Sequence, residues 1–123
     1  CEGMKQKVTS ANYAREVLMA TKPVLVEFYA DWCAKCAMME DVIEELAREN
    51  DFWMKVCQID MEESKDLSEK FEVEIVPTYV VFWKAKPIAA ANGVRDREAL
   101  EEMVKEAIME ERQGGAKETG YEQ

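Results

Sequence analysis

The segment that most constrains the fold is an apolar run, residues 24–30, which is followed one residue later by the sequence Trp-Cys-Ala-Lys-Cys at 32–36. The run has the length of a strand, and its nearly continuous apolar character is typical of a strand buried on both faces. Apolar residues then recur at helical spacing between residues 39 and 46. The sequence therefore predicts a buried strand and a long helix, with a cysteine pair at their junction.

The other elements are predicted from the same periodicities and from cap and turn residues. They are a helix capped by Ser10, a strand over 52–59, a short helix capped by Ser64, strands over 78–83 and 87–91, and a last helix between Asp96 and Gly114-Gly115. This order, αβαβαββα, predicts an α/β fold with one central mixed sheet and helices on both of its faces. We expect the domain to cover residues 10–111, between a polar leader (1–9) and a disordered tail (112–123).

Composition limits the function further. The 123 residues allow one domain with one core, and no apolar run approaches the ~20 residues that span a bilayer. A net charge of −10 disfavours nucleic acid and anionic membrane surfaces as partners. The chain contains no histidine, which excludes Ser-His-Asp triads, Cys/His proton relays and histidine-containing zinc sites.

The cysteine pair has the spacing of a redox centre. The free N–H groups and the positive end of a helix stabilise a thiolate, so Cys33, at the helix start, is the better nucleophile. Cys36 lies about one turn further on and can resolve a mixed disulfide formed at Cys33. Lys35, between them, adds a positive charge that favours the thiolate.

Residues 28–36, Phe-Tyr-Ala-Asp-Trp-Cys-Ala-Lys-Cys, resemble the active-site signature of the thioredoxin family, and Val76-Pro77-Thr78 resembles its cis-proline loop. The resemblance extends from Ser10 to Ile108 and includes Gly93. It implies a thioredoxin fold and a redox-active cysteine pair that needs no bound cofactor or metal. It also implies that Trp32 shapes the docking surface, that Val76 offers backbone hydrogen bonds to substrate, and that Pro77 is cis.

Glu27 stands where the family has a buried acid. A carboxyl in a desolvated strand has a raised pKa, so Glu27 is expected to exchange a proton with Cys36. Two departures from the family pattern matter here. Ala34-Lys35 replaces the usual Gly-Pro and tunes the redox potential, and Val56 stands where the family has a lysine near the buried acid.

The leading interpretation is a monomeric thiol–disulfide oxidoreductase that reduces disulfides in protein substrates. Its electron donor would be a thioredoxin reductase or, for an anchored protein, a membrane thiol-reductant protein. An oxidase or isomerase is the alternative within enzymes, because direction depends on the redox potential. Outside enzymes, the alternatives are a Cu(I)- or zinc-binding carrier that uses Cys33, Cys36 and Met38, and a redox-inert adaptor.

Two further cysteines lie outside the pair. Cys57 falls in a predicted interior strand and is expected to be a small core residue. Cys1 would be the lipid-bearing N-terminus of a mature lipoprotein, in which case the protein is extracytoplasmic and membrane-anchored. Alternatively Cys1 has no such role and the protein is cytoplasmic.

Overall fold

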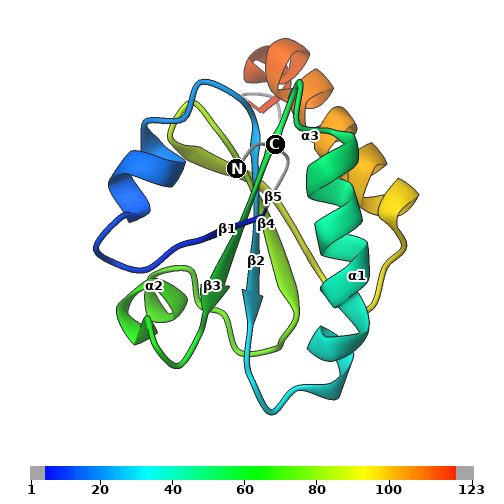
Figure 1. The fold of residues 1–123 in the computed structure, drawn as a ribbon. Helices are drawn as coiled ribbons and strands as arrows, with labels where there is room; N and C mark the ends of the chain where they lie inside the picture. Colours follow the sequence, from blue (N-terminus) through cyan, green and yellow to red (C-terminus); the bar gives the residue numbers. More distant parts are fainter. Residues whose placement is uncertain (1–4, 119–123) are drawn as a thin grey trace.

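The computed structural model describes residues 5–118, which form one α/β domain built on a central sheet (Figure 1). In chain order the elements are β1 (Gln6–Lys7), η1 (Ala14–Leu18, a short π-helical stretch), β2 (Val24–Tyr29), α1 (Ala34–Glu49), β3 (Lys55–Asp60), α2 (Lys65–Lys70), β4 (Thr78–Trp83), β5 (Lys86–Asn92) and α3 (Arg97–Glu118). The α/β fold and the mixed sheet predicted from the sequence are both confirmed.

The sheet has five strands in the order β1-β3-β2-β4-β5. Strands β1, β3 and β2 run parallel, because helical connections return the chain to the same end of the sheet. Strands β4 and β5 are antiparallel and are joined by a tight turn in which Lys84 and Ala85 have positive φ angles. The central strand β2 is therefore hydrogen-bonded on both edges, and its C-terminal end leads directly into α1.

Each face of the sheet has its own apolar core. Leu25, Tyr79 and Val81 face α1 and α3, whereas Val26 and Phe82 face η1 and α2, as the alternation of a strand requires. In Figure 1 the two long helices lie together on one side of the sheet and the short helices on the other. Because β2 is buried on both faces, every one of its side chains from Val24 to Phe28 is inaccessible to solvent.

The N-terminal segment differs from the predicted polar leader. Gln6 and Lys7 pair with β3 as a parallel edge strand, and Val8 is fully buried in the core beneath η1. The observed order therefore has a strand before the first helix. Two polar residues give no strand pattern in the sequence; the pairing comes from β3, whose open edge supplies the hydrogen bonds.

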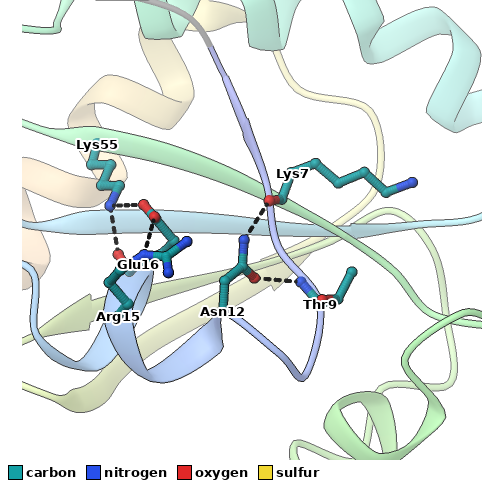
Figure 2. A network of polar contacts seen from close by, with 6 residues as sticks. All are labelled: Lys7, Thr9, Asn12, Arg15, Glu16 and Lys55. Atoms are coloured by element: carbon teal, nitrogen blue, oxygen red, sulfur yellow. Dashed lines mark hydrogen bonds and ion pairs between the residues drawn. The ribbon is translucent and has the colours of Figure 1, made fainter.

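Side-chain hydrogen bonds hold this N-terminal segment against the sheet (Figure 2). The Asn12 amide donates to the Lys7 carbonyl over 3.2 Å and accepts from the Thr9 backbone N–H over 2.8 Å. The Lys55 ammonium on β3 donates to both the carbonyl and the carboxylate of Glu16, over 2.8 and 2.6 Å. The Lys55 bonds fix η1 to β3, and the Asn12 bonds hold the turn between β1 and η1.

The helix boundaries correct two further predictions. Ser10 does not cap the first helix: its hydroxyl donates to the Asp66 carboxylate, and the helical stretch begins only at Ala14. At the other end, α3 continues through Gly114-Gly115 to Glu118. A glycine costs a helix only about 1 kcal/mol relative to alanine, which is too little to stop it by itself. The Asp96 cap is present, since its carboxylate accepts from the Ala99 N–H over 2.8 Å.

Among the described residues, no helix combines the length and apolar character that crossing a membrane requires. Cys1, on which the lipoprotein prediction depends, lies outside those residues, as do residues 119–123 of the predicted tail.

Candidate active site

The cysteine pair lies at the junction of β2 and α1, where the sequence predicts it. Cys33 is the N-cap residue of α1, and its sulfur accepts a hydrogen bond from the Cys36 backbone N–H over 3.1 Å. A cap side chain satisfies an N–H group that has no partner within the helix, and here a sulfur fills that place. The same N–H stabilises negative charge on Cys33, because it points its positive end at the sulfur.

The chain preceding β4 closes over the first cysteine. The Val76-Pro77 peptide bond is cis, and the Cys33 thiol donates to the Val76 carbonyl over 3.6 Å. Pro77 is buried, whereas the neighbouring Ile75 is exposed. The loop therefore places backbone groups next to Cys33 and leaves an apolar side chain free beside them.

Glu27 is the unusual residue of the central strand. It is 1% exposed, and it is the one buried side chain of the described residues with an oxygen, Oε2, that has no hydrogen-bond partner. The other oxygen, Oε1, accepts from the Gln58 amide on β3 over 2.7 Å. Burial raises the pKa of Glu27 from 4.5 to about 7, although the Gln58 hydrogen bond and the Lys5 charge act in the opposite direction.

A cavity of about 320 Å³ connects this carboxyl to the cysteine pair. Its walls include Glu27, Cys33 and Cys36, and it continues outward to Lys5 and Glu40. Burial also raises the pKa of the Cys36 thiol well above its ordinary value, and the hydrogen bond with Cys33 adds to this effect. Cys36 is therefore a thiol that holds its proton firmly, in a cavity shared with a carboxyl that titrates near neutral pH.

The remaining predicted site residues lie on the exposed side of the junction. Trp32 is 66% exposed, and its indole N–H donates to the Glu62 carboxylate over 2.6 Å. Ala34 and Lys35 occupy the first turn of α1 and are also exposed. The structure therefore gathers all eight predicted site residues around Cys33, with Glu27 below the surface and the others at or near it.

Several residues of the cavity were not expected from the sequence. Gln58 could have been found, because it interrupts the apolar part of β3 directly opposite Glu27 in the register. Lys5 and Glu40 gave no signal, since the first falls in the predicted polar leader and the second is one of many acidic residues on the predicted long helix. Val56, at the place of the family's lysine, is buried in the core and offers Glu27 no charge.

Within the part of the chain that the structure describes, no three cysteine, aspartate or glutamate side chains gather as a metal-binding group would. Met38, which the carrier alternative requires, is exposed on α1. The structure therefore gives no support to the metal-carrier alternative.

Comparison with known proteins gives a consistent picture. The family model described as thioredoxin matches residues 4–106 of this chain. The thioredoxin of Mycobacterium tuberculosis is 36% identical over 94 residues, which are 76% of this chain and 81% of that protein. A Mycobacterium leprae protein named bifunctional thioredoxin reductase/thioredoxin is 34% identical over 98 residues, which are 80% of this chain and 21% of that protein.

A solved structure agrees with the sequence matches. A mutant thioredoxin from Halobacterium salinarum superposes with a TM-score of 0.77 and 31% sequence identity. The match covers 85% of this chain and 91% of that one. The similarity thus includes both the sheet and the helices that position the cysteine pair.

Proposed function

Because this chain belongs to the thioredoxin family and is a thiol–disulfide oxidoreductase, we propose that it reduces disulfide bonds in protein substrates through Cys33 and Cys36. The observation that carries the proposal is the position of Cys33, whose sulfur caps α1 and accepts the Cys36 N–H. A sulfur in that position is stabilised as a thiolate, and the thiolate is the form that attacks a disulfide.

In the first step the Cys33 thiolate attacks one sulfur of the substrate disulfide. A bond forms between Cys33 and that sulfur, the substrate S–S bond breaks, and the departing thiolate takes a proton from water. The substrate segment lies against the loop that precedes β4, where Val76 supplies backbone hydrogen bonds and Pro77 shapes the loop. Trp32, held by Glu62, borders the same surface.

In the second step Cys36 attacks the Cys33 sulfur of the mixed disulfide. The Cys36 proton passes to the Glu27 carboxylate, the Cys33–Cys36 bond forms, and the substrate leaves as a second thiolate, which is then protonated. The substrate gains two electrons and the enzyme loses two. The raised pKa of Cys36 and the shared cavity support a base at this position, because a thiol that holds its proton attacks only as it loses it.

The oxidised pair must then be returned to the dithiol by a donor of two electrons. A thioredoxin reductase is the proposed donor, supported by the relative that is named for both activities. A membrane thiol-reductant protein would take this place if Cys1 carries lipid. In both cases the cysteine pair itself carries the electrons. We propose that the domain acts as a monomer.

The direction of electron flow depends on the Ala34-Lys35 dipeptide, which differs from the family's usual pair. A redox titration of Cys33–Cys36 against dithiothreitol measures the potential directly. A value at or below the cytosolic glutathione range of roughly −220 to −260 mV supports the reductase. A clearly more oxidising value would instead favour an oxidase or isomerase.

The assigned roles are tested by single substitutions in an insulin-reduction assay driven by dithiothreitol. Cys33→Ser should reduce turnover to background, because no nucleophile remains. Cys36→Ser, reduced and then incubated with insulin after the dithiothreitol has been removed, should form a mixed disulfide that survives non-reducing electrophoresis, since no second thiol of the protein resolves it. Cys57→Ser is the matched control, because the Cys57 thiol is fully buried away from this site. Normal turnover by Cys36→Ser would overturn the resolving role.

A further inference from the structure

The cavity that contains Glu27 includes a lysine from outside the sheet's central strands. Lys5, which directly precedes β1, lines the same cavity as Glu27, Cys33 and Cys36. Its side chain is only 19% exposed, and its ammonium lies 3.6 Å from the Glu40 carboxylate on α1. A lysine this far buried is uncommon unless its charge is paired, and here the partner is Glu40.

The chain around Lys5 is anchored well enough to hold that position. The Val8 N–H donates to the Gln58 carbonyl over 2.8 Å, and the same Gln58 donates its side-chain amide to Glu27. Asn12 holds the Lys7 carbonyl from the other side (Figure 2). Gln58 thus ties both the segment that follows Lys5 and the buried carboxyl to one residue of β3.

We propose that Lys5 is a positioning residue of the exchange reaction: its ammonium, held by Glu40 where the cavity meets solvent, favours the ionised form of the Glu27 carboxyl, which accepts the Cys36 proton. This inference depends on the proposed function, since it assigns a partner to Glu27 in that reaction. Val56 stands where the family has a lysine near the buried acid. The proposal explains how this chain functions without that lysine, because Lys5 supplies a positive charge from the segment that precedes β1.

The other groups around Glu27 cannot take this place. Besides Lys5, the cavity wall carries the polar or titratable side chains of Tyr29, Asp31, Cys33, Cys36, Glu40 and Gln58, and Tyr79 lies opposite Glu27 in the β4 register. None of these is a cation. Glu40 raises the pKa of Glu27, whereas the charge of Lys5 lowers it. A polar cavity of this size also admits water, through which the proton that Glu27 accepts can leave.

The test is the titration of the Glu27 carboxyl in the reduced protein, followed by ¹³C NMR. We expect Lys5→Met to raise the Glu27 midpoint by roughly 0.5–1 pH unit, because an opposite charge is lost. Lys5→Arg should keep the midpoint near that of the wild type. The acidic limb of the insulin-reduction pH profile should move with the midpoint in each variant.

Lys7→Met is the matched control, because Lys7 lies two residues further along the chain, pairs with Glu63, and is not part of the cavity wall. It should leave the Glu27 midpoint where it is. An unchanged midpoint in Lys5→Met, or an equal shift in Lys7→Met, would overturn the proposal, even if activity fell. A wild-type protein that does not reduce insulin would overturn the proposed function instead, while the midpoints would still show whether Lys5 controls Glu27.

Discussion

At the scale of single residues, Glu27 shows that a group placed for proton transfer can lower the stability of the fold. Its carboxyl occupies the centre of the most buried strand, with one oxygen lacking any partner. An ionised group in such a place is unfavourable, and so the folded protein binds a proton there more tightly than the unfolded chain does. The pKa of about 7 follows from that imbalance, and it places the titration of Glu27 where proton transfer is most useful.

The first residue-scale prediction concerns stability and pH. Between 4.5 and about 7 the folded state binds more protons than the unfolded state, so the free energy of unfolding falls as pH rises through this window. The full loss, reached above pH 7, is about 3 kcal/mol. Glu27→Gln cannot ionise and so avoids this loss. The variant should therefore be more stable than the wild type at pH 8, and the difference should be much smaller at pH 4. Urea denaturation of the reduced proteins measures the difference.

A matched variant separates this effect from loss of charge in general. Glu44→Gln removes one acid from an exposed position of α1. Its stability relative to the wild type should be nearly the same at both pH values, because an exposed carboxyl stays solvated. If Glu27→Gln and Glu44→Gln behaved alike, burial of Glu27 would not be the cause.

At the scale of elements, the sequence predicted what depends on local pattern and missed what depends on a partner. The strand β2 and the helix α3 were predicted, because the spacing of their apolar residues indicates which positions are buried. The strand β1 was not, since its two polar residues form a strand only when paired with β3. Lys5 was missed for the same reason, and with it the outer part of the Glu27 cavity.

The predictions of helix ends succeeded or failed for similar reasons. Asp96 was recognised as a cap because its bond to Ala99 is local. Ser10 was misread because its hydroxyl turns to Asp66, a residue 56 positions away. The two glycines near the end of α3 suggested a stop that the structure does not have. A cap signal is therefore reliable in this chain where its bond is local, as at Asp96, and fails where a distant partner competes, as at Ser10.

The second prediction concerns the start of α3. Asp96→Ala removes the bond to the Ala99 N–H and should lower the free energy of unfolding by about 1 kcal/mol. Asp96→Asn is the control, since asparagine caps equally well and should retain most of the stability. Guanidinium denaturation of both variants provides the comparison. Equal losses in both would assign the effect to charge at the helix end and not to the capping bond.

At the scale of the whole molecule, the sheet separates two cores and carries the site at one end. Cys33, Cys36 and the loop before β4 lie where β2 ends, whereas Cys57 lies within β3, between β1 and β2. Cys57 is 0% exposed, and burial raises the pKa of its thiol to about 12. The same residue type is thus reactive at the helix start and shielded inside the sheet, because reactivity follows thiolate character and access.

The last prediction uses this contrast to measure how the molecule opens. In the reduced protein treated with iodoacetamide, the peptide containing Cys33 should be alkylated first. The peptide containing Cys57 should react at least ~10³ times more slowly, because it must wait for an unfolded population. If that population is the globally unfolded one, the labelling rate of Cys57 should rise with urea as steeply as the unfolding equilibrium does.

Local detachment of β1 is the competing route, because only two residues of β1 cover this edge of β3. Labelling of Cys57 that is insensitive to urea would show that β1 opens alone. Since Lys5 directly precedes that strand, such opening would also release Lys5 from the Glu27 cavity.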